Sequence, residues 1–468
     1  MHQESINRYF TEHRQDLIDA VCRLIRFESV KGMPEGDMPF GSGPAAVLKE
    51  ALSMAKEMGF STHNYENYIG AVDLQDGARQ LDILVHLDVV PAGDGWTITE
   101  PFCPVIQDGC LYGRGSADDK GPAVAALFAM KAVKDLGIPL RKSVRLLLGT
   151  DEENGCGDTE YYYAREAEAP MTISPDASYP VIYIEKGGLQ PTFYSSWKAD
   201  DVLPRVRTLD GGVKGNVIPS QATMELEGFD RCEIETLLRE AQRKTDVAFS
   251  IEALPDDALL VTATGSGAHA SLPTDGNNAL TALLELAAHL PAAPCEGFKK
   301  ISALHELFPH GDWRGNAAGV AMSDELSGEL TICLNVLHYQ NGSLTGAFDS
   351  RIPLCGTKEN VRDVLDAKLT EFGICMEPRR QYPAHHIPAD SPLVTALMKC
   401  YRQYTGCDDK PIAVGGATYV HGFKNGVAFG CSMPGTNNRM HGPDEFAVIE
   451  ELIVSAKIFT QVIIDLCS

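Results

Sequence analysis

The stretch LDILVHLDVV, Leu81–Val90, indicates the fold of the first part of the chain. It is an apolar, β-branched run of strand length, and such runs are typical of buried strands. A helical segment follows at 121–137, with a proline near its start and a glycine at its end. Two further short apolar runs, at 143–151 and 171–176, also end in polar residues. This alternation predicts an α/β domain whose mostly parallel sheet is flanked by helices.

The pattern changes after the sequence EKGG at 185–188. Half-exposed strand patterns follow at 221–229, 259–267, 328–339 and 343–353, and the Asn341–Gly342 pair is a hairpin signal. Helical stretches lie between these strands, at 232–245 and 277–290. The α/β pattern returns with 391–406, a strand candidate at 426–435 and a closing helix at 448–466. We therefore expect a discontinuous catalytic domain, 1–186 and 383–468, and an inserted α+β lid domain, 187–382.

Composition excludes several classes of partner. The chain has 468 residues and a formal net charge of −24, which argues against nucleic acid and anionic membranes because both need a basic face. The start of the chain lacks the apolar core of a signal peptide, and residues 6–25 have the spacing of one amphipathic helix. Thirteen scattered cysteines without a CxxC pair fit a reducing compartment. We expect a cytoplasmic protein without a membrane span.

Acidic and histidine side chains gather where the predicted strands end. They are His86 and Asp88, Asp118 and Asp119, Glu152 and Glu153, Asp176, and His441. In an open α/β sheet, ligands bind beyond the carboxyl ends of the strands, so these five segments should converge.

A metal centre explains this crowding, because cations make adjacent carboxylates favourable. His and Asp/Glu ligands suit zinc, cobalt or manganese. Two divalent ions carry four positive charges, which three carboxylates and one hydroxide would cancel beside two neutral histidines. Residues two apart on an extended segment face the same way, so Asp88 can orient the ring of His86. Adjacent residues face opposite ways, so one of Glu152 and Glu153 can bind metal while the other acts as general base.

Several of these segments resemble one enzyme family. The motifs HLDVVPAGDGW, YGRGSADDKGP, GTDEENG and PDASYPVIYIEKG, in this order, are similar to those of the co-catalytic metallopeptidases that include aminoacylase, carboxypeptidase G and carnosinase. The similarity extends to GNVIPS, GSGAHAS, FDSRIP, GGATY and MHGPDEF, so it covers nearly the whole chain. It is closest to the bacterial dipeptidases of the PepV type.

The resemblance implies a role for each matching residue. Five residues would hold two metal ions, with Asp118 as the bridge: His86, Asp118, Glu153, Asp176 and His441. It also implies a cis peptide between Asp118 and Asp119, and it makes Glu152 the general base and Asp88 the residue that orients His86. Substrate would be held by residues of the lid and of the GGATY motif, namely Asn216, His269, Arg351, Gly415 and Gly416.

The resemblance therefore predicts a metallodipeptidase that acts on short peptides with a free C-terminus. Zinc is the favoured metal, with manganese or cobalt as alternatives. PepV-type chains have a long lid that supplies its own histidine, and the insert here is long enough for that, so the resemblance also implies a monomer. The relatives continue GGxTY with a small residue and Arg, whereas this chain has Val420 and His421, so its substrate range should differ. The alternatives are an N-acyl-amino-acid amidohydrolase on the same scaffold and a non-catalytic metal- or peptide-binding homologue.

Simpler interpretations exist for some of these residues. Arg351 could merely pair with Asp349, and His421 is typical of a surface residue. We interpret His385 and His386 as a solvated pair in a linker.

Overall fold

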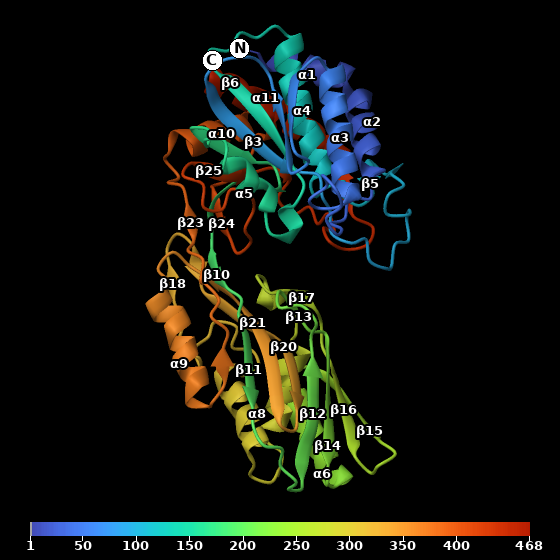
Figure 1. Cartoon of the computed structure of the whole chain (residues 1–468), viewed down its shortest axis with the longest axis vertical. Coiled ribbons are helices and arrows are strands. Elements are labelled where there is room, and N and C mark those ends of the chain that lie inside the picture. The colour runs from blue at the N-terminus through green and yellow to red at the C-terminus, as the bar shows by residue number, and fades with distance from the viewer. Residues whose placement is uncertain (1) are drawn as a thin grey trace. The chain divides into compact units, whose positions relative to one another are not determined.

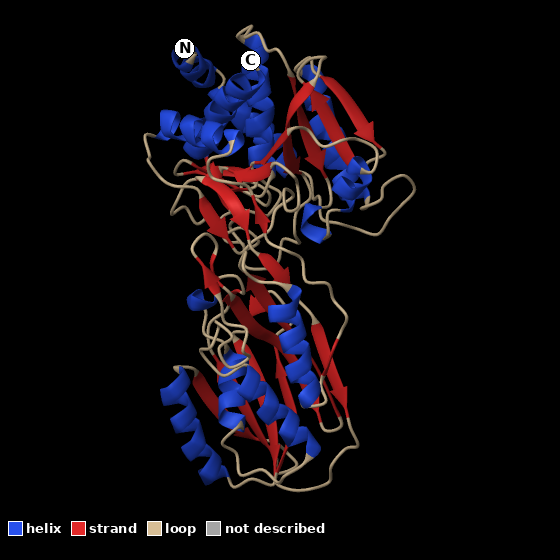
Figure 2. Ribbon diagram, turned by 90° about the vertical axis from the view of Figure 1, so that its left-hand side faces the viewer, coloured by secondary structure: helices blue, strands red, loops and turns tan. Residues whose placement is uncertain are grey.

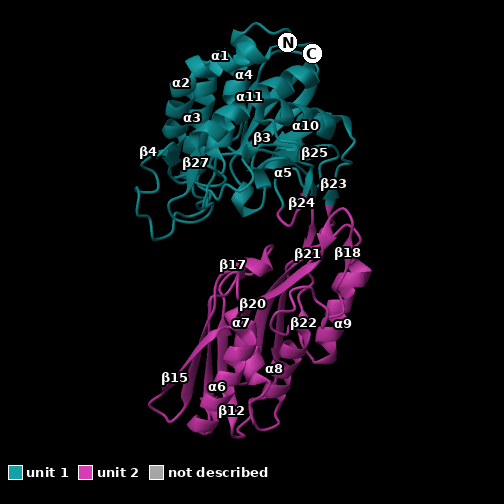
Figure 3. Ribbon diagram, turned by 180° about the vertical axis from the view of Figure 1, so that it is seen from behind, with its two compact units in different colours: residues 1–184, 385–412, 417–468 teal, residues 185–384, 413–416 magenta. Residues whose placement is uncertain are grey.

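The chain forms two compact units in this computed structural model, which describes residues 2–468. Unit 1 comprises Met1–Ile184, His385–Ile412 and Ala417–Ser468, and unit 2 comprises Glu185–Ala384 and Ala413–Gly416 (Figures 1 and 3). Unit 2 thus includes residues 413–416, which the expected boundaries assign to the catalytic domain. Over residues 2–468, every helix is too short or too polar to cross a membrane.

Unit 1 is built on one sheet. Its strand order is β1 (Ser61–Tyr65), β2 (Ile69–Asp73), β6 (Ser143–Gly149), β3 (Arg79–His86), β7 (Met171–Ser174), β25 (Gly426–Phe429), β9 (Val181–Glu185) and β23 (His385–His386), and β24 (Ile412–Val414) also pairs with β9. The four strands β6, β3, β7 and β25 are parallel, whereas β1, β2 and β9 pair antiparallel. The predicted α/β fold with a mostly parallel sheet is confirmed.

Helices cover both faces of this sheet (Figure 2). They are α1 (Gln3–Glu12), α2 (Arg14–Ile25), α3 (Ser42–Glu57), α4 (Lys120–Asp135), α5 (Gly157–Tyr163), α10 (Pro392–Thr405) and α11 (Ile449–Cys467). Gly70 of β2 lies against Leu48 and Leu52 of α3, while its neighbours Ile69 and Ala71 pack with Tyr162 of α5. Since adjacent strand residues point to opposite faces, α3 and α5 lie on opposite sides of the sheet.

Smaller elements complete unit 1. They are the 3-10 turn η1 (Glu152–Asn154), the sheet of β4 (Val105–Gln107), β5 (Cys110–Tyr112) and β27 (Phe446–Val448), and the pair β8 (Ala177–Ser178) and β26 (Cys431–Ser432).

Two local expectations for unit 1 are wrong. The expected single N-terminal helix is two helices, because the chain leaves helical geometry at His13, where φ is −100° and ψ is 17°. His385 is buried rather than solvated, and its Nε2 lies 2.7 Å from the carbonyl oxygen of Gly426. It forms β23 with His386, so these residues extend the sheet instead of forming a polar linker.

Unit 2 is an antiparallel sheet packed with helices. The strand order is β15 (Ala248–Ala253), β16 (Leu259–Thr264), β14 (Gln221–Glu227), β12 (Arg205–Gly211), β20 (Thr331–Gln340), β21 (Ser343–Ile352), β11 (Thr192–Ser196) and β22 (Cys375–Met376), with β10 (Gly187–Leu189) beside β21. Asn341 and Gly342 form the predicted two-residue turn between β20 and β21. Two short pairs are separate: β13 (Val217–Ile218) with β17 (Ala268–His269), and β18 (Ser323–Asp324) with β19 (Gly328–Glu329).

The helices of unit 2 outnumber the two predicted ones. They are α6 (Arg231–Thr245), α7 (Ala279–Ala287), α8 (Glu296–Leu307) and α9 (Asp363–Glu371), with the short turns η2 (Pro273–Asp275) and η3 (Lys358–Arg362). α6 and α7 lie at the predicted positions, and α8 and α9 are additional. The inner faces of this sheet and its helices form one continuous apolar core.

Candidate metal centre

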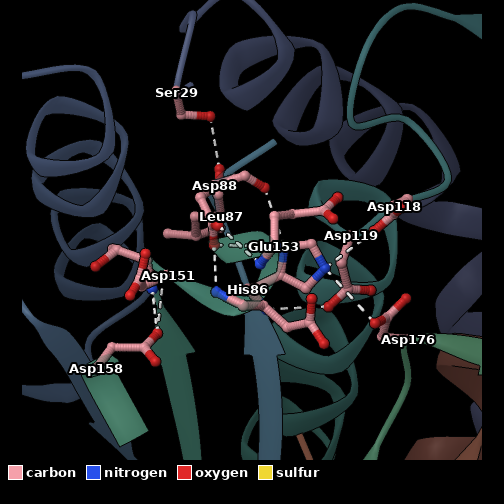
Figure 4. Close-up of polar contacts among 12 residues, drawn as sticks. Ser29, His86, Leu87, Asp88, Asp118, Asp119, Asp151, Glu153, Asp158 and Asp176 are labelled. Carbon is pink, nitrogen blue, oxygen red and sulfur yellow. Dashed lines mark hydrogen bonds and ion pairs between the residues drawn. The ribbon is translucent and has the colours of Figure 1, made fainter. Parts of the chain in front are cut away.

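The polar residues of unit 1 converge because parallel strands end together. In the register of β3 and β6, His86 lies opposite Gly149, so the segments that follow each strand leave the sheet side by side. The turn η1, which contains Glu152 and Glu153, therefore starts beside His86. Asp176 follows β7, the next strand of the sheet. Figure 4 shows the side chains of His86, Glu153 and Asp176 gathered above the strand ends.

Two groups of side chains could each hold a cation. One consists of His86, Asp118 and Asp176, and the other of Asp118, Glu153 and His441. Within each group the ligand atoms all lie within 4.8 Å of one another. Asp118 belongs to both groups: its Oδ1 lies 2.9 Å from His86 Nε2, and its Oδ2 lies 2.9 Å from His441 Nε2. The geometry therefore places the carboxylate of Asp118 between two adjacent sites, which is the position of a bridging ligand.

The direction of the His86 ring fits a metal ligand. Its Nε2 is buried and has no hydrogen-bond partner of acceptable geometry among residues 2–468, although carboxylate oxygens lie 2.9 and 3.6 Å away. Burial alone would lower the pKa of His86, but the carboxylates of Asp118 and Asp176 outweigh it and hold this pKa well above its usual value. The cluster thus strongly favours positive charge at the ring nitrogen, and a cation can supply that charge.

His441 meets the same acidic surroundings on a more exposed loop. Its Nε2 lies 3.0 Å from Glu153 Oε1, and contacts with Asp118 and Glu153 raise the pKa of His441 to about 10. Burial opposes ionisation of Asp118, yet His441 and His86 hold its pKa below the usual value. The ionised carboxylate of Asp118 therefore stabilises positive charge on both histidine rings.

Asp88 contacts both His86 and the turn η1. His86 Nδ1 lies 3.0 Å from the backbone oxygen of Asp88 and 3.6 Å from its Oδ1, so the carbonyl is the nearer orienting group. The carboxylate of Asp88 instead accepts hydrogen bonds from the backbone N–H groups of Glu152 and Glu153, each at 3.2 Å. Asp88 is thus placed to orient the ring and to fix the two glutamates.

Glu152 and Glu153 lie in the 3-10 turn η1 rather than on an extended segment. Glu153 points to His441, whereas Glu152 belongs to neither candidate ligand group. Burial, followed by the neighbouring carboxylates, raises the pKa of Glu152 well above its usual value, although His86 opposes this. A carboxyl group whose pKa is raised accepts a proton more readily than an ordinary carboxylate does.

Two further buried carboxylates, Asp119 and Glu445, hold the ligand loops. Asp119 Oδ2 accepts a hydrogen bond of 3.1 Å from the backbone N–H of His86, and the peptide bond between Asp118 and Asp119 is cis, as the resemblance implies. Glu445 Oε1 accepts from the N–H groups of Gly115, Ala117 and Asp118, and its Oε2 accepts from Arg114 at 2.6 Å. The only sequence signal for either role is proximity to Asp118 or His441.

The residues expected to hold substrate all lie in unit 2. His269 pairs with Val217 across β13 and β17, and the N–H of Ala270 donates to the backbone oxygen of Asn216 at 2.9 Å. His269 Nδ1 accepts a hydrogen bond of 3.2 Å from the N–H of Ser271. When Nδ1 accepts in this way, the proton of the neutral ring is on Nε2, which is then a donor.

Arg351 lies beside the same segment. Its Nε and Nη2 donate to Asp349 at 2.6 and 2.9 Å, so the simple pairing with Asp349 does occur. Its Nη1 donates to the backbone oxygen of Gly415 at 2.6 Å, and a side chain at Gly415 would also meet Ser271. A side chain at Gly416 would meet nothing within 4 Å. The structure thus brings together Arg351, Gly415 and the segment after His269.

Comparison with known proteins places the chain among peptidases. The sequence model described as Peptidase family M20/M25/M40 matches residues 83–465. The chain is 33% identical to a putative dipeptidase of Bacillus subtilis, YtjP, over 97% of both chains. It is also 33% identical to the Beta-Ala-Xaa dipeptidase of Lactobacillus delbrueckii subsp. lactis over 98% of both. Human carnosine dipeptidase 1 is similar in fold, with a TM-score of 0.61 at 13% identity over 100% of this chain and 99% of that one.

Proposed function

The chain belongs to peptidase family M20/M25/M40 and is a peptide-bond hydrolase, and we propose that it hydrolyses dipeptides in a metal-dependent reaction. The observation that carries this proposal is the Asp118 carboxylate, whose two oxygens each lie 2.9 Å from a different histidine. Relatives named dipeptidases match the chain over nearly its whole length, which supports short peptides as substrates.

The proposed metal centre uses only residues of unit 1. His86 and Asp176 would hold one divalent ion, Glu153 and His441 the other, and Asp118 both. Ligands of nitrogen and oxygen without sulfur favour zinc, with manganese or cobalt as alternatives. When bound, such ions would polarise the scissile carbonyl and would also lower the pKa of a water molecule, so that it loses a proton more readily and becomes a better nucleophile.

The side chains supply the proton transfers. Glu152 takes a proton from the attacking water and returns it to the leaving amine. Asp88 fixes the peptide groups of Glu152 and Glu153. Their orientation lets Glu152 accept the proton while Glu153 serves as a metal ligand. The resemblance gives His269 Nε2–H the role of donating to the carbonyl oxygen as negative charge develops. It assigns recognition of the C-terminal carboxylate to Arg351 and Asn216, and the substrate pocket to Gly415 and Gly416.

The substitution Glu152→Gln tests this assignment. It removes the proton acceptor but leaves all five proposed ligands, so metal content should stay at that of the parent. The turnover number for a dipeptide should fall by about 100-fold or more, which is the range for loss of a general base. Glu160→Gln, on the exposed side of α5, is the matched control and should keep full activity. A near-normal rate in Glu152→Gln would remove Glu152 from the reaction.

Substrate class is tested on the same preparation. Dipeptides and N-acylated amino acids, assayed side by side with and without a chelator, should show chelator-sensitive hydrolysis of the dipeptides. Preferential cleavage of the acylated amino acids would instead support an amidohydrolase on this scaffold.

We further propose that the protein is a cytoplasmic monomer in which unit 2 acts as the lid. All thirteen cysteines, which lie within residues 2–468, are free thiols, and this fits a reducing compartment. Light scattering should give the mass of one chain, 50.7 kDa. A stable dimer at micromolar concentration would contradict this.

A further inference from the structure

We propose that Asp158 and Tyr419 are positioning residues that fix the turn holding Glu152 and Glu153, an inference that rests on the proposed function. Neither side chain belongs to the candidate ligand groups. Both are buried in unit 1, and they come from α5 and from the GGATY motif respectively.

Asp158 binds the first half of the turn. Its Oδ2 accepts hydrogen bonds from the backbone N–H groups of Thr150 at 2.6 Å and Asp151 at 3.0 Å. Its Oδ1 accepts from its neighbour Thr159 at 2.7 Å. Figure 4 shows the carboxylate of Asp158 directed at Asp151.

Asp88 binds the second half of the same turn. It accepts from the N–H groups of Glu152 and Glu153, so two buried carboxylates together hold the four consecutive amides of residues 150–153. Rotating any one of these peptide groups would leave a buried carboxylate short of a donor, which is costly. The directions in which Glu152 and Glu153 leave the chain are therefore fixed from both sides.

Tyr419 secures Asp158. Its hydroxyl donates to Asp158 Oδ2, the oxygen that already binds the turn. The fit is close at Gly149, where a Cβ atom would lie 2.1 Å from the Tyr419 hydroxyl oxygen and 2.6 Å from Asp158 Oδ2. The ring of Tyr419 also lies edge-on to the ring of His86, with centroids 6.2 Å apart. One tyrosine thus links the end of β6, the glutamate turn and His86, one of the proposed ligands.

The substitution Tyr419→Phe tests the proposal with little change in volume. Loss of the hydroxyl should let Asp158 and the turn shift, and a displacement of about 1 Å at a reacting group can cost up to 100-fold in rate. We expect kcat to fall roughly ten-fold at saturating zinc or manganese while KM stays within about two-fold. A residue that only stabilises the fold would lower the melting temperature and leave kcat per folded molecule unchanged.

Tyr401→Phe is the matched control. Tyr401 is also fully buried in unit 1, and its hydroxyl donates to Asp409 at 2.7 Å, but it lies on α10 and touches no residue of the turn. Both variants should lose similar stability, and only Tyr419→Phe should lose kcat. Equal kcat values in the two variants, each measured on metal-loaded protein, would overturn the proposal.

A double-mutant cycle checks the route of the effect. On an Asp158→Ala background, Tyr419→Phe should change kcat by less than about two-fold, because the acceptor is already gone. The same ten-fold loss on that background would show that Tyr419 does not act through Asp158. If Asp158→Ala does not fold, the comparison of Tyr419→Phe with Tyr401→Phe decides the question on its own.

The parent and Glu152→Gln are measured in the same series, so that failure of the proposed function can be told from failure of this inference. An inactive parent or an active Glu152→Gln refutes the proposed function. An unchanged kcat for Tyr419→Phe in an active, Glu152-dependent enzyme refutes only this inference.

Discussion

At the scale of single residues, Asp118 is the position on which both candidate cation sites depend. Asp118→Asn would remove one negative charge from two sites at once and replace one ligand oxygen with an amide nitrogen. We expect the metal content to fall from two ions per chain to less than one, at metal concentrations that saturate the parent. Elemental analysis after gel filtration measures this. Asp390→Asn, an exposed position, should retain both ions, and two ions in Asp118→Asn would contradict the bridging role.

Asp82 gives a pH-dependent prediction away from the metal ligands. It is fully buried in β3, and burial raises its pKa to about 6 although Arg79 and Arg145 oppose the shift. The folded protein therefore holds this proton more tightly than the unfolded chain does. Stability contributed by the protonated group is complete below about pH 4 and is lost as the pH rises to about 6, a change of about 3 kcal/mol.

Asp82→Asn should remove this dependence. The amide cannot ionise, so the variant should gain stability relative to the parent as the pH rises from about 4 to about 6. Melting temperatures of both proteins at closely spaced pH values measure the difference. If the two curves stay parallel across this interval, the carboxylate of Asp82 does not titrate there.

At the scale of elements, Glu445 connects two loops that contain proposed ligands. Its carboxylate binds three N–H groups of residues 115–118 and the guanidinium of Arg114, and its own loop includes His441. In Glu445→Gln the new NH₂ group would face either Arg114 or the loop amides, all of which are donors. Disrupting one partner of a buried pair costs about 3–5 kcal/mol.

We therefore expect Glu445→Gln to bind metal more weakly as well as to melt earlier. Chelator competition well below the melting temperature measures the metal affinity of folded protein. Glu450→Gln is the control, because Glu450 forms an exposed pair with Arg14 that contributes little. Unchanged metal affinity in Glu445→Gln would show that Glu445 supports the fold alone.

The elements that the sequence predicts well are those whose pattern is local and complete. β3, α4 and β6 show uninterrupted burial or helical spacing, and the turn at Asn341–Gly342 has its own signal. α8 was missed because its N-cap is Cys295, an unusual capping residue, and α9 because it begins in the π-turn η3, which shifts the helical period. The segment of α9 does have a start signal, the capping box of Thr357 and Asn360, but this box precedes the π-turn rather than the helix itself.

The same reasoning explains which part of the site could be predicted. His86, Glu153 and Asp176 follow strand ends, so strand assignment indicates that they meet. Asp118 lies just before α4 instead, and only the resemblance indicates its bridging role. The partnerships of Asp158 with Tyr419 and of Glu445 with Asp118 join residues 261 and 327 positions apart. Such contacts arise from tertiary packing, and the sequence around either residue does not predict its partner.

At the scale of the whole molecule, the two units should respond differently to metal. Every proposed ligand lies in unit 1, and unit 2 has its own separate apolar core. A ligand that binds only the folded form stabilises it by about 2.7 kcal/mol at 100 times its Kd. Calorimetry of the metal-free protein should therefore show that added zinc or manganese raises the transition of unit 1 by several degrees and leaves that of unit 2 in place. Hydrogen exchange assigns each transition to its unit, because metal should slow exchange in β3, β6 and η1 but not in β20 and β21. Equal protection of both units, with a single shifted transition, would show that metal binding is coupled to folding of the entire chain.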